Sequence, residues 1–201
     1  IAMAHYVKMT AMPQMVALLN GFGGAASAIV ATIGILQKQE DPSAVDAAFT
    51  IPAALGILIG WPTFSGSVGA FAKLQELIRG RPIVYAGQQA MNMLLLLVAF
   101  AFSVVYIAKP TVLWPVWVLS IVSLIWGILF IIPIGGADMP VVICILNSLS
   151  GCAACATGFA LNNHALIIAG ALVGASGTLL SILMCKAMNR SIRNVLFGAF
   201  G

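Results

Sequence analysis

Six long apolar stretches run along the chain and are separated by short polar ones. They cover Met12–Leu36, Ile51–Leu77, Ala86–Ala108, Val112–Ile134, Met139–Leu161 and Ala165–Met188. A helix that crosses the hydrocarbon core of a bilayer needs about 20 mainly apolar residues, and each stretch is long enough. The connections Lys109-Pro110-Thr111 and Leu161-Asn162-Asn163-His164 are tight turns. The pattern therefore predicts an all-α, polytopic transmembrane helix bundle with six spanning helices in this segment.

The composition agrees with lipid as the solvent. Of the 201 residues, 62% are hydrophobic and only 7% are charged, and the mean hydropathy is +1.10. A soluble domain carries about 25% charged residues. Nine Lys and Arg residues are too sparse for a nucleic-acid interface, so no nucleic acid is expected and membrane lipid is the expected surrounding. The chain begins without Met, and its first four residues read like the end of an earlier apolar helix, which suggests a segment of a longer polypeptide.

The cations are unevenly divided between the two ends of the predicted bundle. If the N-terminus lies on one side, six crossings return the C-terminus to that side. That side then holds Lys8, Lys73, Arg79, Arg81, Lys186, Arg190 and Arg193, whereas the other side holds only Lys38 and Lys109. Because positive charge accumulates on the cytoplasmic side of membrane proteins, both termini are predicted to be cytoplasmic.

Small residues within the helices predict close packing. Gly170-xxx-Gly174 with Gly177, Gly56-xxx-Gly60, and Gly21-Phe22-Gly23-Gly24 would let helix backbones approach one another. Cys152 and Cys155 have the spacing that puts both on one helix face, but no acidic residue or His lies near them in the sequence. We interpret them as small residues of a helix interface, and no metal site is expected.

A layer of polar side chains is predicted near the middle of the membrane. Counted at 1.5 Å per residue, Asn20, Asn147, Ser176 and Ser67 lie about 12–18 Å from the cytoplasmic helix ends. Polar groups at that depth require partners or water. They either bond helices together or line a path for water. Asn and Ser can donate and accept hydrogen bonds, but they cannot exchange charge near neutral pH.

Titratable groups are predicted only near the helix ends. Asp138 begins a helix on the cytoplasmic side, where its carboxylate would suit the helix N-terminus, and Arg190 follows another helix on the same side. The residues His5 and His164 are interpreted as surface residues. A proton path built from this chain alone would therefore lack a group whose protonation can switch.

Several motifs resemble the membrane domain (domain II) of the β subunit of proton-translocating nicotinamide nucleotide transhydrogenase. They are Gly135-Gly136-Ala137-Asp138-Met139-Pro140-Val141-Val142, Leu146-Asn147-Ser148 with Ser150-Gly151, Gly170-Ala171-Leu172-Val173-Gly174 with Ser176-Gly177, Met184-Cys185-Lys186-Ala187-Met188-Asn189-Arg190-Ser191, Phe64-Ser65-Gly66-Ser67-Val68 and Met12-Pro13-Gln14-Met15-Val16-Ala17. The similarity runs from about Lys8 to the C-terminus, in the family's order. It implies that residues 1–201 form a proton-conducting domain, coupled to hydride transfer from NADH to NADP⁺.

The resemblance also implies partners. NAD(H) and NADP(H) would bind to separate domains of the complete enzyme, with no cofactor bound in this segment. The NADP(H)-binding domain would follow Gly201, where Asp138 and Arg190 would contact it, and the complete complex would be a homodimer. The membrane would be the inner membrane of a bacterium or, alternatively, of a mitochondrion.

One position departs from many members of the family. Many carry a His where this sequence has Asn20; others place a His on a neighbouring helix of the partner subunit. The chain resembles the second kind, so the α-subunit membrane helices are expected to supply the relay His. Two other functions stay open from the residues alone: a secondary transporter for a small solute or ion, and an assembly subunit in which the polar layer only holds helices together. A nucleotide-binding domain encoded after Gly201 would distinguish the transhydrogenase proton channel from the transporter and from the assembly subunit.

Overall fold

The computed structural model describes residues 11–39, 46–78 and 80–197. Its helices are α2 (Met12–Lys38), α3 (Ala47–Leu74), α4 (Gln88–Ala108), α5 (Trp114–Ile131), the short 3₁₀ helix η3 (Gly136–Asp138), α6 (Met139–Ala160), α7 (His164–Ala187) and α8 (Ile192–Phe197). The described residues contain no strand, and helices α2 to α7 are each long and apolar enough to cross a membrane. The predicted all-α bundle with six spanning segments is confirmed.

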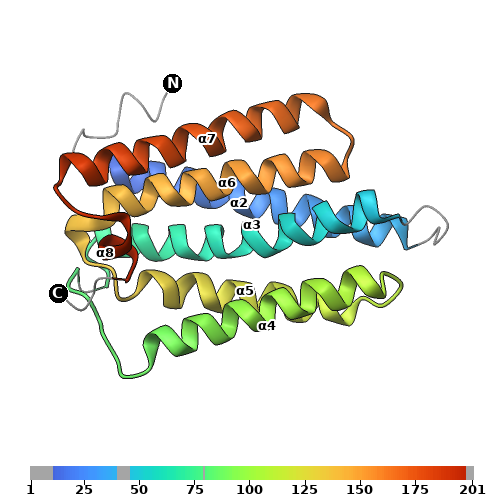
Figure 1. The fold of residues 1–201 in the computed structure, drawn as a ribbon, viewed down its shortest axis with the longest axis horizontal. Coiled ribbons are helices and arrows are strands. Elements are labelled where there is room, and N and C mark those ends of the chain that lie inside the picture. Colours follow the sequence, from blue (N-terminus) through green and yellow to red (C-terminus); the bar gives the residue numbers. More distant parts are fainter. Residues whose placement is uncertain (1–10, 40–45, 79, 198–201) are drawn as a thin grey trace.

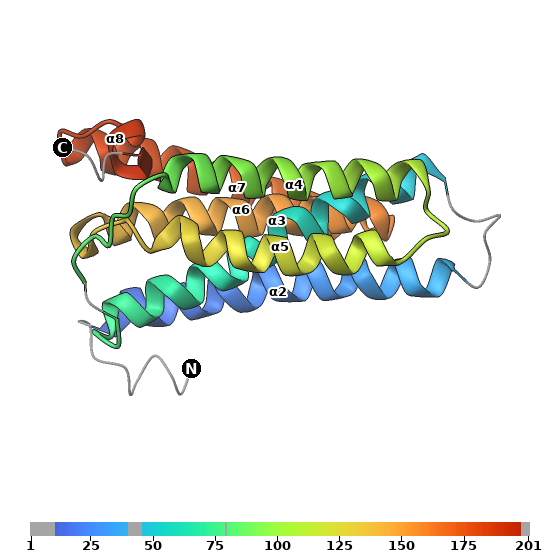
Figure 2. The same ribbon diagram turned by 90° about the horizontal axis from the view of Figure 1, so that it is seen from below.

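The six long helices run side by side along the long axis of the molecule (Figure 1). Helix α3 lies at the centre and packs against α2, α4, α5 and α6. Helix α7 packs on the outside of α6, and α4 covers α5 and the edge of α3. The view from below shows α4 and α2 on opposite sides of the bundle, with α3, α5 and α6 between them (Figure 2). The α2, α3 and α6 side chains therefore meet inside the bundle.

Local signals set the helix ends. The carboxylate of Asp46 caps α3 by accepting a hydrogen bond from the Phe49 amide at 3.0 Å, and Asn163 caps α7 in the same way. This cap starts α3 at Ala47, four residues before the predicted start. The predicted end at Leu77 is also wrong: α3 stops at Leu74 because Glu76 adopts a left-handed conformation with φ of 59°.

Glycines bring the backbones of two helix pairs into direct contact, as the sequence predicted. A Cβ atom added to Gly24 of α2 would lie 2.8 Å from the carbonyl oxygen of Gly60 in α3. A Cβ added to Gly151 of α6 would lie 2.4 Å from the amide nitrogen of Gly174 in α7. Real side chains do not approach so closely, so only glycine fits at these crossings.

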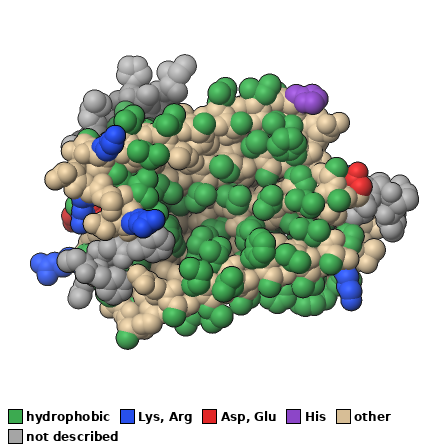
Figure 3. Space-filling view, viewed as in Figure 1, with side chains coloured by type: hydrophobic (Ala, Val, Ile, Leu, Met, Phe, Trp, Pro, Cys, Tyr) green, Lys and Arg blue, Asp and Glu red, His purple; other side chains and the backbone are tan. Residues whose placement is uncertain are grey.

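The two ends of the bundle differ in charge (Figure 3). Lys73, Arg81, Lys186, Arg190 and Arg193 lie where α3 and α7 end, which we call the basic end. The opposite end carries Lys38, Lys109, Asp46 and His164. Lys8 and Arg79, which the sequence also assigned to the basic side, lie outside the described residues, as does His5. Apolar side chains cover the surface between the two ends.

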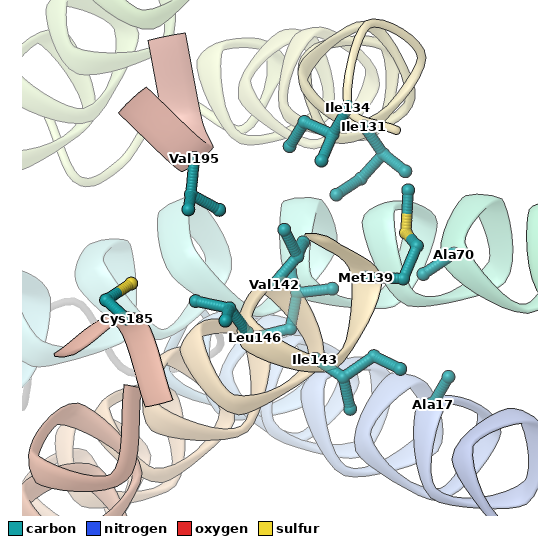
Figure 4. Close-up of a cluster of buried hydrophobic side chains, with 11 residues drawn as sticks. Ala17, Ala70, Ile131, Ile134, Met139, Val142, Ile143, Leu146, Cys185 and Val195 are labelled. Atoms are coloured by element: carbon teal, nitrogen blue, oxygen red, sulfur yellow. The ribbon is translucent and has the colours of Figure 1, made fainter. Parts of the chain in front are cut away.

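At the basic end, a cluster of buried apolar side chains packs α6, α7 and α8 against one another (Figure 4). Met139, Val142 and Leu146 of α6 form its middle, and Val195 of α8 and Cys185 of α7 pack around them. Val195 is only 3% exposed. The short helix α8 is thereby anchored to the bundle, which holds the segment after α7 beside the start of α6.

Candidate functional site

Asn20 joins α2 to α6 through two hydrogen bonds. Its side-chain Nδ2 donates to the carbonyl oxygen of Ile143 at 3.2 Å. Its backbone carbonyl accepts a hydrogen bond from the Ser150 hydroxyl at 2.8 Å. The Asn20 side chain is 8% exposed. A polar residue in the middle of α2 is therefore held against α6 within the bundle.

Asn147 lies between the two α6 residues that bind Asn20. It follows Ile143 by four positions and precedes Ser150 by three, so all three share one face of the helix. The Asn147 side chain is half-buried, and it makes no hydrogen bond to another described residue. An amide in this position has donors and an acceptor left to bind water or a partner helix.

Ser67 of α3 completes the meeting of three helices. It is fully buried, and its hydroxyl oxygen has no hydrogen-bond partner among the described residues. Its Cβ lies 3.1 Å from the position that a Cβ would take on Gly21, next to Asn20. A buried hydroxyl without a partner costs about 1–3 kcal/mol. A bound water that bonds to it would remove this cost.

Further polar side chains continue this arrangement towards the opposite end. The Thr63 hydroxyl donates to Ile59 at 2.7 Å, and its Cβ lies 2.9 Å from a Cβ built on Gly24. The Thr157 hydroxyl donates to the backbone carbonyl of Ser27 at 3.2 Å, again joining α6 to α2. We call the whole set the α2–α3–α6 seam: Asn20, Ser27, Thr63, Ser67, Asn147, Ser150 and Thr157.

Four seam residues are not among the predicted site residues. Ser27, Thr63 and Thr157 look like ordinary small residues of apolar helices, and Ser150 is noted only as part of a motif of the resemblance. Their spacing held a usable signal. Asn147, Ser150 and Thr157 recur at intervals of three and seven, and Thr63 and Ser67 at an interval of four, which place polar groups on single helix faces.

Ser176 lies apart from the seam. It is exposed on α7, and its hydroxyl donates to the Val173 carbonyl of its own helix at 3.1 Å. The glycines Gly170, Gly174 and Gly177 occupy the face of α7 that packs on α6. Counting residues predicts how deep Ser176 lies along the helix, but it does not predict which way the side chain faces. The rotation of α7 about its axis turns Ser176 outwards. The structure thus brings together three of the four predicted polar residues.

Asp138 and Arg190 form an ion pair at the basic end. Both carboxylate oxygens of Asp138 accept hydrogen bonds from Nη1 of Arg190, at 2.5 and 2.7 Å. The Asp138 side chain makes no capping hydrogen bond to α6. The pair connects the start of α6, the helix that carries Asn147, with the segment between α7 and α8.

Lys73 has a structural role that its charge alone did not reveal. It is 3% exposed, and its Nζ donates to the carbonyl oxygens of Ile131 at 3.3 Å and Ile134 at 2.8 Å, and also to that of Ile132. The last carbonyls of a helix have no partner within the helix, and a cation there is favourable. Lys73 therefore holds the end of α5 and the turn that leads to Asp138. From the sequence, Lys73 was used only as one of the positive charges that predict the cytoplasmic side.

Comparison with known sequences assigns the chain to a family. The profile of the family described as NAD(P) transhydrogenase beta subunit matches residues 1–201. The chain belongs to this family. Two curated proteins from Rhodospirillum rubrum, both named NAD(P) transhydrogenase subunit beta, are 47% identical to it over 202 aligned residues. The alignment covers 98% of this chain and 43% of each relative, so the chain spans less than half of their length.

The described part of this transhydrogenase β-subunit chain offers few groups for chemistry. It contains no cluster of three His, Cys, Asp or Glu residues that could hold a metal ion. Cys152 packs at the α6–α7 crossing, where its Sγ lies 3.2 Å from a Cβ built on Gly174, and all four cysteines are free. The seam and the basic end are thus two polar arrangements of the described residues in a largely apolar bundle.

Proposed function

We propose that this chain is the proton-conducting membrane part of a transhydrogenase that couples inward proton movement to hydride transfer from NADH to NADP⁺. The family assignment favours this function over a secondary transporter. The observation that carries the proposal is the fully buried Ser67 hydroxyl, which lacks a partner where α3 packs on Gly21, the residue after Asn20. Water bound there would continue to the free amide of Asn147, and hydroxyl and amide groups would orient it for proton transfer.

The group that takes up and releases the proton belongs to a partner. No titratable side chain of the described residues lies in the seam, whereas a gated path needs one that can switch near neutral pH. Next to the seam, Phe22 of α2 is 62% exposed, and Gly23, which faces Ser150, is exposed as well. A membrane helix of the α subunit packed there would bring a His to Asn20 and Asn147. Because Ser176 faces outwards on α7, it could contribute to the path only if a helix of a partner packed on the outer face of α7.

The basic end couples the path to the nucleotide-binding domains. An NADP(H)-binding domain after Gly201 would dock beside α8 and act on the Asp138–Arg190 pair, while NAD(H) would bind to a further domain. The concentration of positive charge at this end supports a cytoplasmic location for it. The complete enzyme would be a homodimer in the inner membrane of a bacterium, or in that of a mitochondrion.

The coupling role of the ion pair is tested by the substitution Asp138→Asn. It keeps the side-chain shape but replaces a charge-assisted pair with a weaker hydrogen bond. The assembled complex should form in normal amounts, while proton-coupled hydride transfer should fall several-fold. Lys186→Gln removes a charge at the same end without touching the pair and serves as the control. Equal coupled rates in Asp138→Asn and the unaltered enzyme would remove Asp138 from the coupling mechanism.

The proton path is tested by Asn147→Leu in the complete enzyme reconstituted into vesicles. Leu has a similar volume but cannot bond to water, so the complex should assemble while most proton translocation is lost. Asn147→Ser, which keeps a hydroxyl in the seam, should recover part of it. A pH-sensitive dye inside the vesicles reports translocation, and blue native electrophoresis reports assembly. Full translocation by an assembled Asn147→Leu enzyme would rule out the seam as the path.

A further inference from the structure

A cavity of about 690 Å³ opens at the basic end, away from the seam. It lies between the start of α4, the end of α5, the turn before α6, and α8. Its lining includes Arg81, Gln88 and Asn92 on one side and the Asp138–Arg190 pair on another. The ends of spanning helices lie at the level of the lipid headgroups, so this cavity is placed where a headgroup would be found.

Two amide side chains line the cavity without hydrogen-bond partners for their oxygens. Gln88 is only 5% exposed, and its Oε1 has no partner among the described residues. The same is true of the buried Oδ1 of Asn92, one helical turn further along α4. Spacing of four residues puts both amides on one face of the helix. Such buried polar atoms are normally bonded, so a ligand that offers hydroxyl groups would satisfy them.

The charge of the cavity favours an anion. The Asp138 carboxylate and the Arg190 guanidinium neutralise each other. Arg81 makes no ion pair with any described residue, and its exposed guanidinium leaves one positive charge at the rim. Arg is well suited to bind a phosphodiester because its planar donors match the phosphate oxygens.

The remaining wall is apolar and continues onto the membrane-facing surface. It consists of Met93, Leu96, Trp126 and Phe130. The rings of Trp126 and Phe130 lie 5.7 Å apart, and Met93 is 56% exposed. An acyl chain could leave the cavity along this wall and enter the bilayer without crossing a polar surface.

We propose that this cavity binds an anionic phospholipid, phosphatidylglycerol, with its phosphate on Arg81, its glycerol hydroxyls on Gln88 and Asn92, and one acyl chain along the Trp126–Phe130 wall. Basic pockets between membrane helices on the cytoplasmic side are suited to such headgroups. The lipid would hold α4 and α8 against each other beside the Asp138–Arg190 pair. This binding site does not depend on the proposed proton path.

Native mass spectrometry of the complete, delipidated enzyme tests the proposal. Phosphatidylglycerol, phosphatidylethanolamine and phosphatidylcholine are added separately, and the bound copies per protomer are counted. One copy of phosphatidylglycerol should bind per protomer, with higher affinity than phosphatidylethanolamine or phosphatidylcholine. Arg81→Gln should weaken its binding by about fivefold, as expected for one surface cation, and Gln88→Leu should weaken it as well. Lys109→Gln, which removes an exposed cation at the opposite end, should leave it unchanged.

Three results would overturn the proposal. Equal binding of the three lipids would mean ordinary contact with the bilayer, and preference for phosphatidylethanolamine would contradict an anionic ligand. Phosphatidylglycerol binding that neither Arg81→Gln nor Gln88→Leu alters would place the lipid elsewhere and leave the cavity to another part of the complex. Arg81 is exposed, so its substitution tests the site even if Gln88→Leu does not assemble.

Discussion

The two sides of the bundle are built in different ways. Helices α2, α3, α6 and α7 meet through glycines, with backbones nearly touching at Gly24–Gly60 and Gly151–Gly174. Helices α4 and α5 pack against each other through bulky side chains instead, such as Phe102 against Trp114 at a ring distance of 5.6 Å. This α4–α5 hairpin meets α3 at a glycine, because a Cβ on Gly127 of α5 would lie 2.4 Å from the carbonyl oxygen of Pro62. Helix α4 has few buried residues and turns most of its surface outwards.

The two sides also differ in the hydrogen-bond partners of their buried polar side chains. Close backbones bring polar groups of α2 within hydrogen-bonding distance of those of α6. In α4 the buried Ser103 hydroxyl donates to the Ala99 carbonyl of its own helix at 3.2 Å. The Ser120 hydroxyl of α5 does the same with the Val116 carbonyl at 2.9 Å. In the seam, by contrast, the Asn20, Ser150 and Thr157 side chains connect α2 with α6.

The largest expected effect comes from filling a glycine crossing. In Gly60→Leu a Cβ would lie 2.6 Å from the carbonyl oxygen of Gly24, which is backbone and cannot move aside. Overpacking costs typically about 1–3 kcal/mol and more where backbone is displaced. The complex should fail to assemble, as judged by blue native electrophoresis.

The matched control is Gly80→Ala, because a Cβ at Gly80 would meet nothing within 4 Å. That variant should assemble normally. Normal assembly of Gly60→Leu would show that the α2–α3 contact is looser than described, and the contrast between the two sides of the bundle would be lost.

A smaller effect is expected from Lys73→Met, which keeps the length of the side chain but removes its three hydrogen bonds. The carbonyls at the end of α5 would then lose their buried donor, at a cost of about 1–3 kcal/mol. The melting temperature of the complex should fall, and coupled hydride transfer should fall with it, since the turn before Asp138 is less well held. Lys186→Met, at an exposed position, should change neither. An unchanged melting temperature in Lys73→Met would show that these bonds add nothing to stability.

The smallest effect on stability, but a clear one on function, is expected from Ser67→Ala. Removing a buried hydroxyl that has no protein partner should change the free energy of unfolding by less than about 1 kcal/mol. Proton translocation should nevertheless drop several-fold. Ser103→Ala removes a buried hydroxyl from the hairpin side, and there translocation should not change. Equal translocation by both variants would show that the two sides do not differ in function.

The fold followed from the sequence because hydrophobic length decides where a membrane helix lies. All six spans begin and end within four residues of their predicted limits. The differences at the two ends of α3 are caused by the Asp46 cap and by the left-handed conformation of Glu76. The glycine contacts were also foreseeable, since only small residues allow such approach. These features depend on one helix or on one pair.

The site was less predictable because it depends on helix rotation and on contacts far apart in the chain. The depths of Asn20, Ser67 and Asn147 were correct enough to bring them together, but the same reasoning included Ser176, which faces outwards. Lys73 could not be distinguished from a surface cation, because its acceptors lie 58 to 61 residues away. Nearly uniform apolar composition gives weak information about which face of a helix is buried.

Proton conduction through the α2–α3–α6 seam requires water within it, and a density map of the complete complex that resolves ordered water would test this requirement most directly. We expect a water within about 2.7–3.0 Å of the Ser67 hydroxyl, a usual hydrogen-bond distance, connected through further water to the Asn147 amide. A dry seam, in which the Ser67 hydroxyl bonds to a carbonyl of its own helix and apolar atoms fill the space to Asn147, would rule out conduction along this path.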